Sequence, residues 1–547
     1  MKILTLCKPY LIAHKYALGI YIALTFTTVI ITILSPYILG DFIDNLIQGA
    51  GVQTILRFCF IFGGLNLVRI IKGYITSLLY VKMHTQMGYD FTKAALQHVQ
   101  RSSLSYSNKA DIAYLNNRIT TDANTLIGFS VSVLQSVLTN AVVLVVPFFI
   151  LFSLNGFIAS LMLGFLALYM VLYFACKKKL YEVSFILREK QAKYFSGLLE
   201  QLRHIKLIKT HAVQNEINQR ADVHFTGFNH AVVRNQKVNY LYSGMDGIIS
   251  TIAQIVLFVI GGLQILYGNF TIGMFTIFTS YFNMILSAVR YFYGLGATYQ
   301  NAMASHSRLQ EVFGQQTEAY GTIVLNDIKK ITFQGVNFSY DAEGEKQVIC
   351  NFNTALSRGN MYAITGGNGA GKSTLTSLLL GLYINEFTGV ITYNDTDIRQ
   401  INMNAVRKTL IGYAAQEPIL INDSIQYNLV YNNGEINAPH LQRCIEVLNM
   451  GAFFAQHNVN FEINELNNNI SGGEKQKIAI LSVLYKNPEV MIFDEPTSAL
   501  DAQTTKQFMD YLHEMKRDKI IVIITHDEAV KMRCDGEISP TAPSQHP

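Results

Sequence analysis

A glycine-rich segment that ends in lysine and serine carries the clearest chemistry in the sequence. An apolar run ends at Thr365, and a helical pattern begins near Lys372. Residues 366–373 match G-x-x-x-x-G-K-[ST] in the strand–loop–helix context that this phosphate-binding pattern requires: Gly366, Gly367, Asn368, Gly369, Ala370, Gly371, Lys372 and Ser373. Glycines let backbone N–H groups turn inward around phosphate oxygens at a helix N-terminus. Lys372 offers a charge to the β- and γ-phosphates, Ser373 offers a hydroxyl to Mg²⁺, and Thr374 completes the predicted phosphate site.

A second apolar run, Val490–Phe493, ends in two carboxylates, Asp494 and Glu495. Beside a phosphate-binding loop, the end of such a strand is where Mg²⁺ and the attacking water of phosphoryl transfer are held. We therefore expect Asp494 to hold Mg²⁺ and Glu495 to polarise the water. The two segments together predict ATP hydrolysis with ATP and Mg²⁺ as the required small molecules.

The segment Asn469–Gln476 contains Ile-Ser-Gly-Gly-Glu, and here the sequence resembles the ATP-binding cassette (ABC) transporters, whose signature is Leu-Ser-Gly-Gly-Gln. Other motifs of that family stand in the expected order. The resemblance implies an adenine-stacking Tyr340, a Gln416 that senses Mg²⁺ and the γ-phosphate, a signature of Ser471, Gly472, Gly473 and Glu474, a D-loop Asp501 and a switch histidine, His526. Taken alone, His526 would be interpreted as structural.

The resemblance also implies a partner. In this family each ATP lies between the phosphate loop of one cassette and the signature of another, so a second half-transporter is required. All motifs look intact, which favours a homodimer with two active sites. Glu474 replaces the usual glutamine and puts a negative charge near a polyanion, yet we expect activity because Ser471, Gly472 and Gly473 are kept.

Six apolar stretches are long enough to cross a bilayer, which takes about 20 residues per helix. They cover residues 17–39, 54–81, 127–153, 156–176, 241–267 and 271–293. The intervening segments 82–126 and 177–240 hold five and twelve Lys/Arg, whereas the three opposite loops hold none. By the positive-inside rule, both termini and both long segments are cytoplasmic. We expect a multi-pass protein of a bacterial cytoplasmic (inner) membrane, with the lipid bilayer as a partner.

The two long cytoplasmic segments read as helix, so the spanning helices are expected to continue beyond the bilayer. The resemblance implies that Lys109–Asp122 and Gln201–Ala212 are coupling segments seated on the cassettes, whereas periodicity alone fits solvated surface helices equally well. Two other stretches resemble the family. They are Pro36–Gly40 with Asp44, at the end of the first span, and Thr271–Gly273, at the start of the sixth.

Arg69, Lys72 and Asp246 are charged residues inside the apolar spans. A charge at the bilayer centre costs about 2.5–3.5 kcal/mol on insertion scales, so it normally faces a cavity or a partner. Arg69 and Lys72 share a helix face because they are three residues apart. Either they line a translocation cavity and meet a carboxylate of the cargo, or they snorkel or pair with Asp246.

The composition agrees with this division into a membrane half and a soluble half. Half of the residues are hydrophobic and 15% are charged, which is low for a soluble protein. The net charge of +5 comes without a basic run interleaved with aromatics, so no nucleic-acid partner is expected. The six cysteines are scattered without metal-ligand spacing, and we expect neither disulfides nor a cysteine metal site.

The expected fold is a membrane α-helical domain of six helices, type IV ABC exporter-like, followed by an α/β P-loop NTPase domain. The expected boundaries are 1–313 for the transmembrane domain, 314–329 for a linker, 330–538 for the nucleotide-binding domain and 539–547 for a disordered tail. The family typically extends further at its C-terminus. A truncated reading frame and dispensable final elements both remain open.

The predicted function is ATP-driven export by alternating access, coupled to cassette dimerisation. The preferred cargo is a small modified or antimicrobial peptide. A lipid or amphiphilic drug is the alternative, and an ATP-gated regulatory or channel subunit is less favoured because Glu495 is present. No cysteine-peptidase sequence precedes the first span, so the chain is not expected to cleave its cargo.

Overall fold

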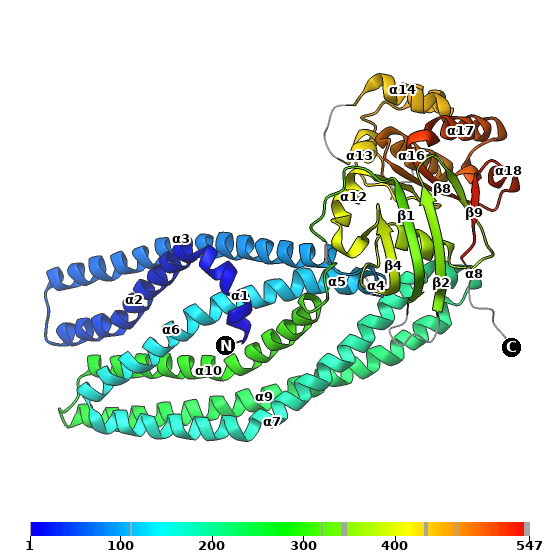
Figure 1. Ribbon diagram of the computed structural model, residues 1–547. Helices are drawn as coiled ribbons and strands as arrows, with labels where there is room; N and C mark the ends of the chain where they lie inside the picture. Colours follow the sequence, from blue (N-terminus) through cyan, green and yellow to red (C-terminus); the bar gives the residue numbers. More distant parts are fainter. Residues whose placement is uncertain are drawn as a thin grey trace. The chain divides into compact units, whose positions relative to one another are not determined.

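The computed structural model describes residues 2–109, 112–318, 321–340, 347–431, 436–464 and 469–540. The chain forms two compact units, one of Met1–Leu96 with Leu115–Glu311 and the other of Gln97–Tyr114 with Val312–Pro547. All nine strands among the described residues belong to the second unit (Figure 1). Residues 541–547 of the predicted tail lie outside the described residues.

The first unit is helical, and the six predicted spanning helices are confirmed. A short helix, α1 (Lys2–Ala13), precedes them. The six helices are α2 (Lys15–Ile47), α3 (Val52–Gln100), α6 (Ala123–Leu154), α7 (Gly156–Arg203), α9 (Gln214–Leu266) and α10 (Ile272–Phe313). Because α7 has 48 residues, it is about 72 Å long at 1.5 Å per residue. A bilayer core is about 30 Å thick, so α7 extends well beyond it, as the sequence predicts.

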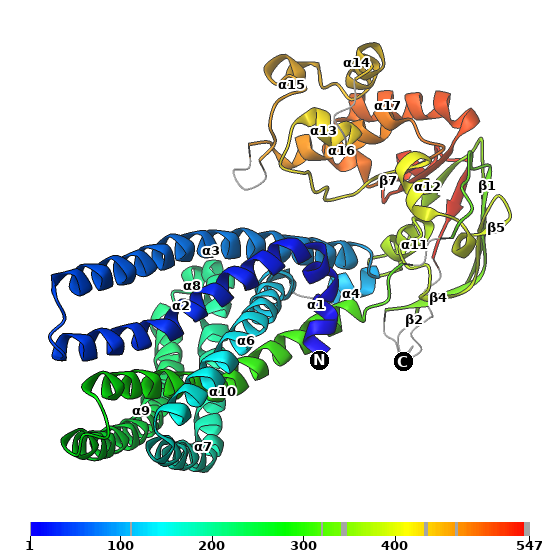
Figure 2. The ribbon, with the colours of Figure 1, turned by 90° about the vertical axis from the view of Figure 1, so that its left-hand side faces the viewer.

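Short turns and a buried seam of large side chains assemble these helices. Asn155 ends α6 and caps α7 by accepting from the Ile158 N–H at 3.1 Å. Helices α7 and α9 run side by side along much of their length (Figures 1 and 2). Large side chains of α10 fill the core, where Phe278, Tyr281 and Phe282 are at most 1% exposed.

The end of α2 is joined to the start of α10. The Asp44 carboxylate accepts from the Gly273 N–H at 2.7 Å and from the Thr271 hydroxyl at 2.6 Å. The two backbones nearly touch here, because a Cβ on Gly40 would lie 2.7 Å from the Gly273 carbonyl oxygen. The two stretches that resemble the family in sequence therefore meet in space. We call this contact the Asp44 clamp.

A second buried contact joins the start of α6 to the end of α10. A π-helical turn, Arg118–Asp122, follows the short helix α5 (Ile112–Asn117). Asp122 is 3% exposed. Its carboxylate accepts from the Ser305 hydroxyl at 2.8 Å and from Arg308 Nε at 2.9 Å. The other long segment that is predicted to be cytoplasmic carries α8 (Ile205–His211) between α7 and α9.

The second unit contains two sheets. The antiparallel sheet has the order β2-β1-β4-β5 and the parallel sheet has the order β6-β7-β8-β3-β9. The strands are β1 (Lys330–Ser339), β2 (Gln347–Ser357), β3 (Met361–Ile364), β4 (Phe387–Tyr393), β5 (Thr396–Asp397), β6 (Ile411–Ala414), β7 (Val490–Asp494), β8 (Ile520–Ile524) and β9 (Gly536–Ile538). In the parallel sheet β3, β7 and β8 are neighbours, so the loops that follow them meet at one edge, where ligands bind in such sheets.

Helices cover the parallel sheet and complete two buried apolar clusters. They are α11 (Lys372–Leu379), α12 (Met403–Thr409), α13 (Ile425–Val430), α14 (Ala438–Val447), α15 (Gly451–Gln456), α16 (Gly472–Lys486), α17 (Ala502–Met515) and α18 (Glu528–Lys531). The predicted final strand is present as β9, which pairs with β3. The Thr365 N–H, just before the phosphate loop, donates to the Ile538 carbonyl at 2.9 Å.

The segment that follows α3 packs within the second unit. The Glu318 N–H donates to the Arg101 carbonyl at 2.7 Å, and the Ser105 hydroxyl, on α4 (Leu104–Lys109), hydrogen-bonds to the Glu386 carboxylate. These contacts lie N-terminal to the predicted coupling segment Lys109–Asp122, of which residues 110–111 are outside the described residues. That Gln201–Ala212 seats on a cassette remains a prediction.

Candidate functional site

The phosphate loop has the backbone geometry that its glycines predict. Strand β3 ends at Ile364 and α11 begins at Lys372. Gly371 caps α11 at φ +91°, and a Cβ there would lie 2.9 Å from Ile349 Cδ1. Only glycine meets both conditions, because an L side chain at this φ is strained and this one would also clash. The loop therefore delivers backbone N–H groups to the N-terminus of α11, which favours anions.

Lys372 lies at the centre of the predicted site. Its ammonium donates to the Gly366 carbonyl at 2.7 Å, and its Nζ is 2.9 Å from His526 Nε2. His526 follows β8, the neighbour of β3 in the sheet. The structure thus brings the lysine of the phosphate loop and the predicted switch histidine together across 154 residues of sequence.

Glu495 stands at the end of β7 with its side chain against two other predicted catalytic residues. Gln416 Nε2 donates to Glu495 Oε2 at 2.7 Å, and His526 Nε2 lies 3.7 Å from Glu495 Oε1. The backbone of Glu495 is left-handed, with φ +47° and ψ +50°. For a residue with a Cβ, this conformation costs about 1–2 kcal/mol. Such strain is typical of functional sites held in place by their surroundings.

Asp494 is set back from Glu495 and is more buried. Burial and the neighbouring negative charge of Glu495 raise the pKa of Asp494, while Tyr413 and Lys372 oppose that rise. The Tyr413 hydroxyl donates to Asp494 Oδ2 at 3.4 Å, from β6 beside β7. No motif in the sequence indicates this contact of Tyr413. Tyr413 lies three residues before Gln416, and that nearness to a predicted site residue was the available signal.

These residues fit the Mg²⁺ that the sequence predicts. Ser373 provides a hydroxyl, Gln416 an amide oxygen and Asp494 a carboxylate, and hard oxygen ligands of this kind suit Mg²⁺. Oxygen-containing side chains thus come from α11, from the loop after β6 and from β7. The same edge of the sheet carries the phosphate loop, so a magnesium ion there would contact the nucleotide as well as the protein.

The signature segment begins α16, and Glu474 has a role there that its charge did not suggest. Ser471 is the N-cap of α16, and its side chain accepts from the Glu474 N–H. The Glu474 carboxylate accepts in return from the Ser471 N–H and hydroxyl, both at 2.7 Å. These hydrogen bonds lower the pKa of Glu474. The pair forms a capping box, which presents Gly472 and Gly473 in the first turn of the helix.

Asp501 and Tyr340 also contact other residues of the second unit. Asp501 caps α17 by accepting from the Thr504 N–H at 2.8 Å and its hydroxyl at 3.0 Å, which lowers the pKa of Asp501. The Tyr340 hydroxyl lies 2.8 Å from the Thr374 hydroxyl, so it reaches the helix of the phosphate loop. Its ring meets Phe338 edge-on at 4.9 Å.

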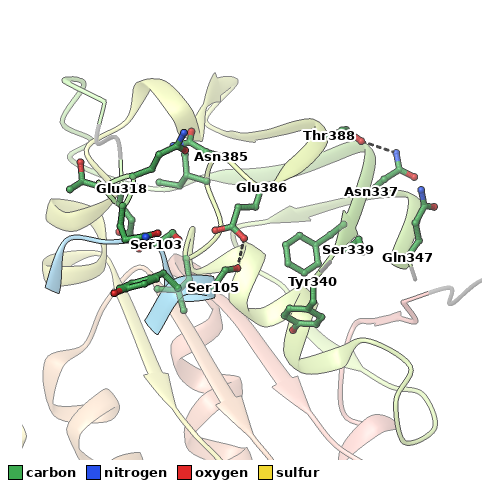
Figure 3. A pocket seen from close by; sticks show the side chains of 17 residues that line it. Ser103, Ser105, Glu318, Asn337, Ser339, Tyr340, Gln347, Asn385, Glu386 and Thr388 are labelled. Atoms are coloured by element: carbon green, nitrogen blue, oxygen red, sulfur yellow. Dashed lines mark hydrogen bonds between the residues drawn. The ribbon is translucent and has the colours of Figure 1, made fainter. Parts of the chain in front are cut away.

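Tyr340 also lines a cavity of 630 Å³ in the second unit. Figure 3 shows Ser103 and Ser105, from the segment after α3, on one side and Tyr340 on the other. Glu386 projects between them and hydrogen-bonds to Ser105. The cavity therefore places the segment after α3 close to the predicted adenine-stacking tyrosine.

The predicted cargo residues lie in the first unit and carry different contacts. Arg69 is exposed on α3, and the Lys72 ammonium donates to the Thr27 hydroxyl of α2. Asp246 pairs with Arg290 Nη2 at 2.9 Å. The alternative prediction, an ion pair of Asp246 with Arg69 or Lys72, is therefore wrong. Arg290 lies in the sixth predicted span and is a further charge inside the apolar helices.

Comparison with protein families gives two matches that together cover most of the chain. The model described as "ABC transporter transmembrane region" matches residues 18–289, and the one described as "ABC transporter" matches residues 349–498. Among solved structures, a bacterial Atm1-family ABC exporter with ATP bound superposes with a TM-score of 0.80 at 18% identity. The match covers 95% of this chain and 92% of that one, so the folds agree.

Three curated relatives illustrate the range of names. A lactococcin-G-processing and transport ATP-binding protein of Lactococcus lactis is 25% identical over 92% of this chain and 72% of its own length. An ATP-dependent lipid A-core flippase of Syntrophus aciditrophicus is 24% identical over 84% of this chain and 77% of its own. The ABC transporter B family member 1 of Dictyostelium discoideum is 24% identical over 76% of this chain, which spans 45% of that protein.

Proposed function

Because the chain belongs to the ABC transporter family and is an ATP-hydrolysing exporter with six membrane-spanning helices, we propose that it exports a small peptide. The observation that carries the cargo proposal is the similarity to the lactococcin-G transport protein, which extends over 92% of this chain. The proposal includes modified and antimicrobial peptides, which the resemblance to peptide-exporting members of the family implies.

In the proposed mechanism, the amides of the phosphate loop and Lys372 bind the β- and γ-phosphates of ATP. Glu495 polarises the water that attacks the γ-phosphorus, and the bond to the β-phosphate oxygen breaks to release ADP and phosphate. Gln416 Nε2 donates to the Glu495 carboxylate at 2.7 Å, and His526 Nε2 lies 3.7 Å from it. His526 also lies beside Lys372, so one imidazole can contact both the base and the γ-phosphate.

Ser373, Gln416 and Asp494 would hold Mg²⁺ in this mechanism. A bound Mg²⁺ would supply positive charge against the negative charge that develops on the phosphates. The residues themselves provide the oxygen atoms and fix their positions on three elements of one sheet edge. Tyr340 is the proposed adenine platform, and its distance of 2.8 Å from Thr374 ties that platform to the phosphate loop.

The half-transporter plan requires a dimer, and we propose a homodimer. The proposed composite site combines Lys372 of one copy with Ser471, Gly472 and Gly473 of the other, with Asp501 in the loop between them. Both half-sites of this chain carry the residues that the mechanism uses. The test is co-purification of two differently tagged copies, which a purely heterodimeric protein would not give.

We also propose that the protein lies in a bacterial cytoplasmic membrane with both termini in the cytoplasm. The asymmetry of Lys/Arg between the long segments and the short opposite loops supports this orientation. A cysteine introduced at Asn269, in the turn between α9 and α10, should react with an impermeant maleimide added to whole cells. One introduced at Gln214, at the start of α9, should react only after lysis.

For the cargo, we propose that Arg69 and Lys72 meet a carboxylate of the peptide. The protein would be placed in liposomes, and ATP-dependent uptake of a fluorescent peptide with a free C-terminal carboxylate would be compared with uptake of its C-terminal amide. The carboxylate form should be preferred, and Arg69→Ala/Lys72→Ala should remove that preference. Arg57→Ala, on the same helix, is the matched control and should keep it. Equal uptake of both peptides by the double variant and the wild type would refute the patch.

A lipid is the second candidate cargo, favoured by the similarity to the lipid A-core flippase. Movement of a fluorescent lipid from one leaflet to the other would be measured in the same liposomes. ATP-dependent movement of lipid without uptake of any peptide tested would replace the peptide proposal with this one. Glu495→Gln should abolish either activity, since both need hydrolysis.

A further inference from the structure

We propose that Gln476 is a positioning residue for ATP hydrolysis, which holds the backbone of Glu495 in the conformation that directs the catalytic carboxylate. The motifs that the sequence resembles leave Gln476 without a role, and it is not among the residues of the mechanism above. It lies in the second turn of α16, four residues after Gly472. Its side chain is buried, with 6% of the residue exposed.

The amide of Gln476 is committed to the turn that follows β7. Its Nε2 donates to the Glu495 carbonyl oxygen at 2.9 Å and to the Ser498 hydroxyl at 2.9 Å. Its Oε1 lies 3.0 Å from the same Ser498 hydroxyl. A buried amide that uses both its donor and its acceptor on one turn fixes the position of that turn, because leaving either group unpaired would cost free energy.

Glu495 is the residue in this turn that needs to be held. Its φ of +47° is in the left-handed region, where residues with a Cβ are strained. The Glu495 N–H donates to the Ile524 carbonyl at 2.9 Å, which ties one side of the residue to β8. On the other side, its carbonyl accepts from Gln476 Nε2, from the Ser498 N–H at 3.2 Å and from the Ser498 hydroxyl at 3.0 Å, and that hydroxyl is itself held by Gln476. Hydrogen bonds thus hold the strained residue at its N–H and at its carbonyl.

The direction of the Glu495 side chain follows from these backbone hydrogen bonds. Its carboxylate lies 2.7 Å from Gln416 Nε2 and 3.7 Å from His526 Nε2, on the edge of the sheet that holds the phosphate loop. Without Gln476 the Glu495 carbonyl would keep only the local donors of Ser498, so the residue could relax toward negative φ and the carboxylate would move away from that edge. Misplacement of a catalytic group by about 1 Å can cost about 100-fold in rate.

The helix that carries Gln476 is a rigid element. Helix α16 is capped at Ser471 by the capping box, and its own residues Ile478, Ile480 and Leu481 are fully buried. A side chain anchored on such a helix can hold the turn at a fixed distance from the sheet. Nucleotide binding does not depend on this contact, because the phosphate loop and Tyr340 belong to other elements. Positioning by Gln476 should therefore affect turnover and leave affinity for ATP in place.

The test uses the full-length protein in liposomes and two substitutions. Gln476→Glu keeps the shape and replaces the donor facing the Glu495 carbonyl with an acceptor. Gln476→Leu keeps the volume and removes both polar groups. Ser482→Ala, which removes a side-chain hydrogen bond further along α16, is the matched control. Steady-state ATPase rates, thermal melting and the nucleotide retained after rapid gel filtration would be measured for each.

The expected result is a loss of about 10- to 100-fold in kcat for both Gln476 variants. Their KM for ATP should stay within about twofold of wild type even though the unpaired groups at the turn lower the melting temperature, and the retained nucleotide should be ATP rather than ADP. Ser482→Ala should behave as wild type. Wild-type kcat in either Gln476 variant would overturn the proposal. So would a parallel loss of kcat, ATP affinity and melting temperature, because that pattern indicates a structural role.

Discussion

Replacing Asp122 with alanine removes a buried charged partner of Arg308, and the structure sets the size of the effect. The Asp122 side chain is 5% exposed, and its carboxylate accepts from Arg308 Nε at 2.9 Å, from Ser305 at 2.8 Å and from Arg118 Nη1 at 3.3 Å. Losing one partner of a buried ion pair costs about 3–5 kcal/mol. Because the Arg308 side chain is 37% exposed, water replaces part of the lost interaction. We expect a cost of about 2–3 kcal/mol for Asp122→Ala on this basis.

Thermal melting of the purified protein in detergent measures this cost. A loss of 2–3 kcal/mol corresponds to a drop of roughly 4–10 °C for a unit of this size. The double variant Asp122→Ala/Arg308→Ala should lose less stability than the two single variants lose together, and the difference, the coupling energy, should be at least about 1 kcal/mol. Asp222→Ala, an exposed carboxylate on α9, is the control and should stay within about 1 °C of wild type. Additive single losses, or an Asp122→Ala protein that melts with the wild type, would refute the reasoning.

Three further outcomes follow from the nucleotide site. Gly371→Ala should abolish ATP binding in a fluorescent-nucleotide titration, because φ +91° and the contact with Ile349 both oppose a Cβ. The control is Gly367→Ala, where a Cβ meets nothing within 4 Å, and its ATP affinity should stay within about threefold of wild type. Equal ATP binding by the two variants would count against the loop geometry. Burial raises the pKa of Asp494, and the hydrogen bond from Tyr413 opposes that rise. Tyr413→Phe should therefore move the acid limb of the pH–kcat/KM profile to higher pH. An acid limb at the same or a lower pH would contradict this. Glu474→Gln should keep the cap and the melting temperature and lower the KM for ATP about two- to fivefold, since it removes a negative charge beside the phosphate-binding face; a raised KM would argue against that charge effect.

The sequence was sufficient where the signal is local. The phosphate loop combines fixed residue types with a fixed strand–loop–helix context, so Lys372 and Ser373 could be placed at once. The spanning helices depend only on length and apolar composition, and all six were found. The approach of Gln416 and His526 to Glu495 needed the resemblance to a family, because these two residues are 79 and 31 positions away from Glu495 in the sequence.

Other features could not be predicted from the sequence, for reasons that are specific to each residue. The Asp246–Arg290 ion pair joins two helices, and no pattern along one helix indicates which charge on another it meets. Gln476 looks like any glutamine on a helix, and its importance comes from a carbonyl on a distant turn. Glu474 is different, because the spacing Ser-x-x-Glu at a helix start predicts a capping box. That local signal is present in the sequence at Ser471 and Glu474.

The Asp44 clamp also has a consequence for how the chain is made. Its two halves are separated by 227 residues of sequence, and Thr271 and Gly273 lie at the start of the last spanning helix to emerge from the ribosome. Until α10 is inserted, Asp44 has to be solvated or shielded by other groups, and the backbone at Gly40 lacks its neighbour at Gly273. The clamp therefore forms only when all six helices are present, because both of its donors come from the start of the last one. A chain that stalls before α10 would leave this carboxylate without those two donors.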